Sequence, residues 1–146
     1  MQFSAASAVE LDPCPIASAW VLEGSPKARI KVISASRDGT AMTVMWDCTA
    51  GKFNWFYGVD ETVYILEGSV TLRDKNGSRV AAVGESVFFP AGSSAEWTVD
   101  SYIKKVAFLR APLPGPLASV RRILVRAKRL LRGGPKTGMG EMFGGA

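Results

Sequence analysis

The chain is dominated by two stretches, GKFNWFYGVDETVYILEG at residues 51–68 and GESVFFPAGSSAEW at residues 84–97. In the second stretch Pro90 presets a backbone φ of about −65° and Gly92 tolerates a positive φ, so residues 90–92 form a turn. Gly68 and Gly84 stand at the ends of apolar runs, where strands turn tight corners. These residues predict short strands separated by sharp turns.

The rest of the chain up to residue 110 continues this pattern. Apolar and polar side chains alternate along residues 28–34 and 40–48, and Asn76-Gly77 is a hairpin signal. We expect about nine short strands with no helix between them, at residues 28–34, 40–48, 52–57, 61–66, 70–73, 79–83, 87–89, 95–99 and 103–109. Such spacing is typical of an all-β sandwich or barrel.

Composition divides the chain into five segments. Residues 1–27 form a small, polar N-terminal arm that lies over the domain, and residues 28–110 form the β domain. Residues 111–116 contain three prolines, which cannot continue a strand or a helix, so they form a linker. We expect a helix at residues 117–132 and a flexible, Gly-rich tail at residues 133–146.

Length and charge set further bounds. At 146 residues the chain is long enough for one domain with a substantial core. It has no run of about 18 apolar residues and no recognisable secretory signal, so we expect a cytoplasmic protein. The net charge of +5 is uneven, because residues 1–114 carry −1 and residues 115–146 carry +6. The basic character therefore belongs to the C-terminal segment.

The two stretches resemble the paired motifs of the cupins, which are small β-barrels. Glu61 stands where the cupin glutamate stands, and the glycines and the proline of the motifs are matched by Gly68, Gly84, Pro90 and Gly92. The chain contains no histidine, and the positions of the three cupin histidines are taken by Trp55, Tyr57 and Ala95. Gly51 also lies closer to the first ligand position than the signature asks.

A smaller group is more similar still: the single-domain cupins akin to (S)-ureidoglycine aminohydrolase and to the ethanolamine-utilisation cupins. The matching residues, all within 28–110, are Trp46, Gly51, Phe53, Trp55, Tyr57, Glu61, Tyr64, Leu66, Gly68, Gly84, Phe89, Pro90, Gly92, Trp97 and Lys105 to Phe108. The resemblance implies an RmlC-like cupin fold, a double-stranded β-helix or jelly-roll barrel. It does not cover the N-terminal arm or the basic amphipathic helix expected after the barrel. Cupins are commonly dimers, so it also implies a homodimer.

The candidate site follows from side chains that share a strand face, because residues two apart in a strand point the same way. By the resemblance that face is the barrel interior, which makes Glu61 a candidate general acid or base and Tyr57 a hydrogen-bond donor. The candidate ligand-binding residues are Trp46, Trp55, Ala95, Trp97 and Lys105. They predict a small polar metabolite in a concave aromatic pocket. The alternative is that the aromatic rings only fill the barrel interior, and that Glu61 and Tyr57 are an ordinary hydrogen-bonded pair in the core.

We expect no metal and no cofactor at this site. Transition-metal sites usually recruit imidazole and hard-cation sites need several oxygens, whereas Glu61 and a neutral Tyr57 offer too few ligands.

A second hypothesis assigns the function of the protein to its C-terminal segment. On a helical wheel residues 117–132 place six basic side chains on one side and a Leu/Ile/Val face on the other. Such a helix fits an anionic membrane surface or an acidic partner, which would make the chain a non-catalytic, dimeric binding or regulatory module. The simpler reading is a helix packed on its own barrel or on a dimer mate. Nucleic acid is a poorer fit, because the β domain shows no basic stripe.

Overall fold

A computed structural model describes residues 8–112. The expected helix at 117–132, the tail at 133–146 and residues 113–116 of the linker lie outside the described residues. Within residues 8–112 the elements are β1 (Asp12–Pro13), the 3₁₀ helix η1 (Ser18–Trp20), β2 (Val21–Gly24), β3 (Ala28–Ala35), β4 (Ala41–Phe56), β5 (Asp60–Asp74), β6 (Gly77–Ala82), β7 (Ser86–Phe89) and β8 (Ser94–Arg110).

Three strands, β4, β5 and β8, are long because each continues through a bend. The pairing register between β4 and β8 shifts between Thr49 and Gly51, and that between β5 and β8 shifts between Gly68 and Thr71. Each long strand joins two of the short strands expected from the sequence. The alternation of apolar and polar residues is interrupted at the bends. The backbone hydrogen bonds between the strands resume beyond each irregularity, as they do around β-bulges.

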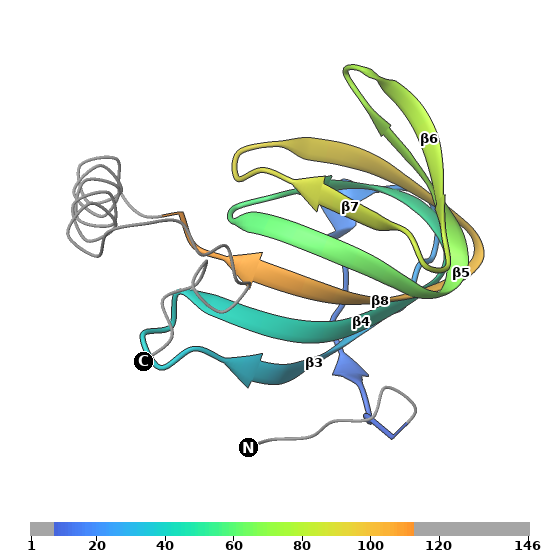
Figure 1. Cartoon of the computed structure of the whole chain (residues 1–146). Helices are drawn as coiled ribbons and strands as arrows, with labels where there is room; N and C mark the ends of the chain where they lie inside the picture. The colour runs from blue at the N-terminus through green and yellow to red at the C-terminus, as the bar shows by residue number, and fades with distance from the viewer. Residues whose placement is uncertain (1–7, 113–146) are drawn as a thin grey trace. The chain divides into compact units, whose positions relative to one another are not determined.

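The bends divide the strands into two layers, visible where β5 and β8 curve round in Figure 1. Sheet one contains β1, β3, β7 and residues 41–49, 60–67 and 103–110 of the long strands. Sheet two contains β2, β6 and residues 50–56, 69–74 and 94–99 of the same strands. All pairs are antiparallel. The expected all-β jelly-roll barrel is confirmed.

The core lies between the two sheets. Buried and more exposed side chains alternate in β5 and β8, whereas residues 44–48 of β4 are all buried. In β8 the buried residues are Ala95, Trp97, Val99, Ile103, Lys105 and Ala107, and the bend falls between Val99 and Ile103. Glu61, Val63 and Ile65 of β5 face the same interior. The side chains that the sequence assigned to one inward face therefore lie inside the barrel.

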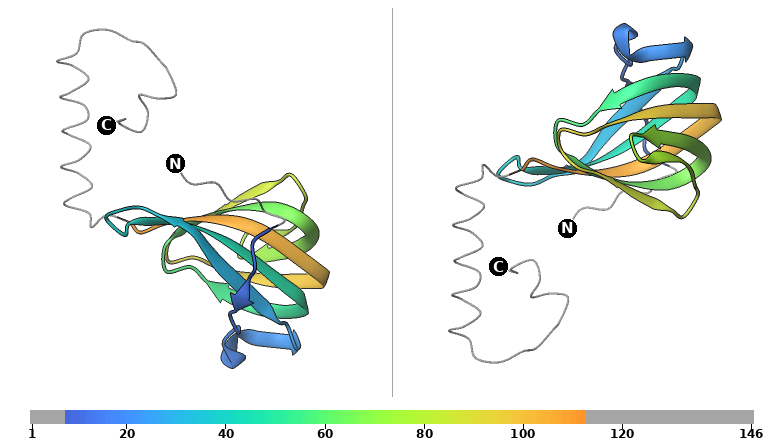
Figure 2. Two further views of the ribbon diagram at one scale, coloured as in Figure 1. Left: turned by 90° about the horizontal axis from the view of Figure 1, so that it is seen from below. Right: turned by 90° about the horizontal axis from the view of Figure 1, so that it is seen from above.

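The described part of the N-terminal arm, residues 8–27, pairs with the barrel of its own chain. β1 pairs with β3, and β2 pairs with the second half of β4, beside which it is drawn in Figure 2. Trp20 of η1 lies edge-on against Trp55 and Phe56 of β4, with ring centroids 5.6 and 5.2 Å apart. The arm thus covers the outer end of the aromatic interior. Among the residues that the structure describes, no helix is long and apolar enough to cross a membrane.

The bend of β5 depends on Gly68, and this yields a first prediction. Gly68 has a φ of +74°, and a Cβ at this position would overlap the backbone carbonyl of Tyr102. We expect Gly68→Ala to lower the free energy of unfolding by more than about 2 kcal/mol, since both the backbone conformation and the close approach are lost. Gly58, where a Cβ would have nothing within 4 Å, is the control. If urea denaturation shows equal stability changes for Gly68→Ala and Gly58→Ala, this account of the bend is wrong.

Candidate functional site

A fully enclosed ion pair lies inside the barrel. Lys105 Nζ of β8 donates a hydrogen bond of 2.7 Å to Glu61 Oε1 of β5, and the two side chains expose only 5% and 8% of their surface. Glu61 stands opposite Leu109 and Lys105 opposite Ile65, so the two residues are four positions apart on neighbouring strands. Their long side chains meet because both point inward from the same sheet.

The ammonium group of Lys105 also lies against two indole rings. Its Nζ is 5.0 Å from the ring centroid of Trp46 in sheet one and 4.7 Å from that of Trp97 in sheet two. Cations over indole faces are attracted by the ring quadrupole, most strongly where water is absent. Burial lowers the pKa of Lys105, and the neighbouring Glu61 carboxylate opposes that shift. Lys105 therefore bridges both layers of the barrel.

Tyr57, which follows β4, has a different partner from Glu61. Its phenolic oxygen accepts a 2.9 Å hydrogen bond from Trp97 Nε1, and its ring stacks on Phe89 with centroids 4.2 Å apart. Burial raises the pKa of Tyr57 well above its ordinary value. The hydroxyl consequently stays protonated and can donate its hydrogen. The structure brings Glu61 and Tyr57 into one interior, but it gives each its own hydrogen-bond partner.

The aromatic rings form a continuous series from the arm to the ion pair. Trp20, Trp55, Trp46 and Trp97 follow each other edge to face, with centroids 5.6, 5.9 and 6.0 Å apart. Trp55 is only half-buried, unlike Trp46 and Trp97. The indole nitrogen of Trp46 is buried and has no hydrogen-bond partner within residues 8–112. A buried donor left in this way costs about 1–3 kcal/mol until an acceptor reaches it.

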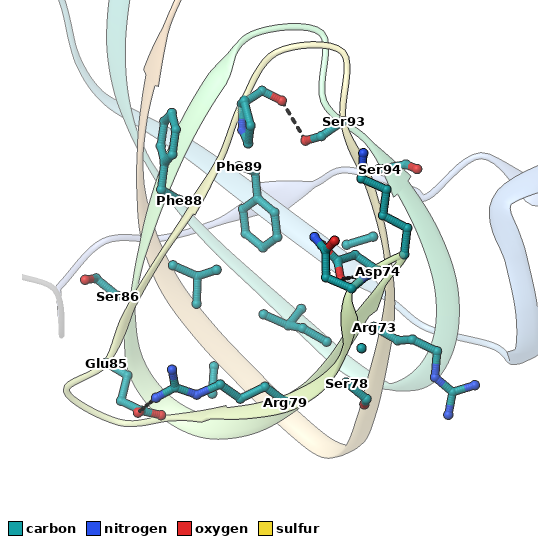
Figure 3. A pocket seen from close by; sticks show the side chains of 18 residues that line it. Arg73, Asp74, Ser78, Arg79, Glu85, Ser86, Phe88, Phe89, Ser93 and Ser94 are labelled. Carbon is teal, nitrogen blue, oxygen red and sulfur yellow. Dashed lines mark hydrogen bonds and ion pairs between the residues drawn. The ribbon is translucent and has the colours of Figure 1, made fainter.

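A pocket of about 810 Å³ opens between the free edges of β6 and β7 (Figure 3). Its apolar wall contains Leu72, Ala81, Val87, Phe89 and Ala95, and its polar rim contains Arg73, Asp74, Lys75, Ser78, Arg79, Glu85, Ser86, Ser93 and Ser94. In Figure 3 the Phe89 ring points into the middle of the pocket, and the Arg79–Glu85 ion pair lies at one rim.

The pocket meets the aromatic interior at Phe89, which lies opposite Glu61 in the pairing of β7 with β5. Of the seven site residues proposed from sequence, only Ala95 lines the pocket; Glu61, Tyr57, Trp46, Trp55, Trp97 and Lys105 do not. Phe89 lies between them, because it faces the pocket and stacks on Tyr57. The rim residues were missed from sequence. The Asn76-Gly77 hairpin was the available signal, but strand pairing alone does not reveal which edges stay open.

The side chains at the cupin ligand positions do not suit the metal that many cupins hold. Trp55 and Ala95 have no donor atom to offer, Tyr57 is protonated and accepts from Trp97, and Glu61 accepts from Lys105. In the described part of the chain no three Cys, Asp or Glu side chains cluster as a metal site.

Comparison with known proteins decides the family. The model of the EutQ-like cupin domain matches residues 35–107. The chain belongs to this family. The match includes Glu61, Tyr57 and Lys105 together with the whole bent part of the barrel. A search of curated protein sequences gave no match.

Solved structures show the same cupin fold. This cupin aligns with a putative ethanolamine utilization protein Q from Salmonella typhimurium at 21% identity and a TM-score of 0.52, over 57% of this chain and 69% of that one. The EutQ protein of Clostridium difficile aligns at 21% identity and 0.53, over 59% and 64%. A DUF861 protein of unknown function from Pseudomonas syringae pv. tomato aligns at 24% and 0.64, over 70% and 45%. The chain thus spans between about half and two thirds of these proteins.

The geometry of the ion pair gives a second prediction. Lys105→Met leaves a buried carboxylate without its partner, so we expect the free energy of unfolding to fall by about 3–5 kcal/mol. The double variant Glu61→Gln/Lys105→Met should recover more than half of that loss, because neither charge is then buried. Urea denaturation measures both.

The neighbouring pair Glu67 and Lys104, joined at 3.2 Å with Glu67 largely exposed, is the control. Lys104→Met should cost no more than about 1 kcal/mol. Equal losses for Lys105→Met and for the double variant would show that the two charges do not depend on each other.

Proposed function

We propose that this cupin binds a small polar metabolite at the inner end of the β6–β7 pocket, without a metal ion. The observation that carries the proposal is the enclosed Glu61–Lys105 pair, whose Glu61 lies opposite the pocket-lining Phe89 in the pairing of β5 with β7. A buried ion pair is often no more stabilising than an apolar pair of similar volume. Retaining two ionised groups in an aromatic interior, next to a ligand-sized hollow, favours a binding role.

Three polar groups are suited to hold the ligand. Lys105 offers a cation, the Tyr57 hydroxyl a hydrogen, and the indole nitrogen of Trp46 a donor that needs an acceptor. All three favour a ligand with carbonyl or carboxylate oxygens. Glu61 would accept a hydrogen bond from the ligand and, if a reaction occurs, a proton.

Phe89 controls access in this proposal. Its ring lies between the pocket and Tyr57, so a change of its rotamer would join the pocket to the polar interior. Side-chain rotamer changes of this kind are common on binding. The charged groups of the rim largely balance each other, because Arg73 is paired with Glu96 at 3.9 Å, Arg79 is paired with Glu85 at 2.9 Å, and Asp74 stands beside Lys75. The preference for a carboxylate therefore comes from the interior donors.

The names of the similar proteins do not identify the ligand of this one. Two of them carry names that refer to ethanolamine utilization, but identities of 21% and 24% extend to the fold alone. The ligand class proposed here comes from the donors inside the barrel.

A matched pair of tyrosine variants tests the site. The full chain is screened by isothermal titration against small carboxylic acids, amino acids and amides, after native mass spectrometry for any retained compound. Tyr57→Phe removes one hydroxyl and keeps the stack on Phe89, so we expect binding to weaken about fivefold to tenfold. Tyr64→Phe, on the outer face of the same barrel, should leave affinity unchanged.

A second pair tests the entrance. Ser94→Trp fills the pocket and should abolish binding, whereas Ser101→Trp, exposed at the bend of the same strand, should not. The proposal fails if Tyr57→Phe and Ser94→Trp both bind like the unaltered chain. It fails equally if no compound is retained and none in the panel binds, since the rings would then only fill the barrel.

A further inference from the structure

The side chain of Lys105 ends in an almost apolar environment that contains a single proton acceptor. The one hydrogen bond that its Nζ makes within residues 8–112 goes to Glu61 Oε1, at 2.7 Å. The other groups around Nζ are the rings of Trp46 and Trp97, whose centroids lie 5.0 and 4.7 Å away. Lys105 therefore has one carboxylate to exchange a proton with, and aromatic surface around the rest of its nitrogen.

This environment favours the form of lysine that reacts with carbonyl groups. In water a lysine is held as an ammonium ion, which has no lone pair, whereas a lysine in an apolar pocket is activated as a nucleophile and forms imines. Burial lowers the pKa of Lys105, although the Glu61 carboxylate opposes that shift. Glu61 is also placed at hydrogen-bond distance to take the proton that Nζ has to lose.

The same surroundings suit the product of such a reaction. A protonated imine keeps its positive charge next to Nζ. The Glu61 carboxylate and the two indole faces that now attract the ammonium group would attract this cation in the same way. An uncharged product would instead leave Glu61 as an unpaired buried carboxylate, which is costly.

We propose that Lys105 forms an imine with a small 2-oxo acid. Glu61 takes one proton from Nζ, the nitrogen lone pair attacks the carbonyl carbon, and a C–N bond forms while the carbonyl oxygen gains the electron pair of its π bond. That oxygen takes a second proton from the nitrogen and then the proton held by Glu61, so it leaves as water when the C–O bond breaks. The product is a protonated imine, Glu61 is again a carboxylate, and no oxidant or reductant is consumed. The inference deepens the proposed function and rests on it, because the acid has to pass Phe89 to reach Lys105.

The carboxylate of a 2-oxo acid would meet a donor that the described residues leave unsatisfied. Trp46 lies opposite Lys105 in the pairing of β4 with β8, and its buried indole nitrogen has no hydrogen-bond partner within residues 8–112. In a 2-oxo acid the carboxylate is bonded directly to the carbonyl carbon, so it stays near Nζ after the imine has formed. Trp46 Nε1 is therefore the donor that distinguishes a 2-oxo acid from a simple aldehyde or ketone.

Reductive trapping in the full, unaltered chain tests the proposal. The protein is incubated with pyruvate and sodium cyanoborohydride near neutral pH, and each modified lysine is located by peptide mass spectrometry. We expect Lys105 to be labelled at least about tenfold faster than Lys104. Lys104 is the matched control, because it precedes Lys105 on β8 but pairs with the largely exposed Glu67. The comparison is made within one chain, so it does not require a variant to fold.

Variants and a second probe separate the imine from simple binding. Lys104→Met should keep the rapidly formed adduct, and lactate, which has a hydroxyl in place of the carbonyl, should give none. If isothermal titration shows pyruvate binding that weakens in Tyr57→Phe, but Lys105 is labelled no faster than Lys104, the imine is overturned and the binding function stands. Rapid labelling of Lys105 that Ser94→Trp does not slow supports the imine and contradicts the pocket as the entrance. Neither binding nor rapid labelling overturns both.

Discussion

The architecture depends on the bends that carry β4, β5 and β8 from one sheet into the other. At Gly68 the backbone takes a conformation that disfavours side chains, and it passes so close to Tyr102 that no Cβ fits. Because one strand serves both sheets, residues a few positions apart face each other across the interior. Lys105 can therefore contact Trp46 in sheet one and Trp97 in sheet two at the same time.

Within that interior the charged and the neutral polar contacts have different consequences. The Trp97–Tyr57 hydrogen bond joins two neutral groups that bring large apolar rings with them, so it satisfies polar atoms in a core at little cost. The Glu61–Lys105 pair requires two ions to leave water, and each loses several kcal/mol of solvation. Their mutual attraction and the two indole faces offset that loss. The ion pair and the unpartnered indole nitrogen of Trp46 are thus two polar features of the described core that stability alone does not readily explain.

The sequence predicted those features that depend on neighbouring residues. The turn at residues 90–92 and the corners at Gly68 and Gly84 follow from glycine and proline geometry. Alternation together with the cupin resemblance placed Glu61, Tyr57 and Trp97 inside. It did not predict that Lys105 is the partner of Glu61, since the two lie 44 residues apart and meet only through the register of β5 with β8. Nor did it predict that Phe89 separates Tyr57 from the pocket. The position of Phe89 depends on how the rings pack in three dimensions, which the spacing of residues in the sequence does not reveal.

The alternation of β5 and β8 that builds the interior also builds the outer face of sheet one. In β5 Glu61 faces inward and Thr62 outward, and in β8 Lys105 and Ala107 face inward while Val106 and Phe108 face outward. Adjacent residues of one strand therefore serve two surfaces on opposite sides of a sheet one backbone thick. A side chain on one face can change without touching the other, whereas any change in the strand register would move both. This is why the bends, which fix that register, constrain the barrel interior and the outer face of sheet one together.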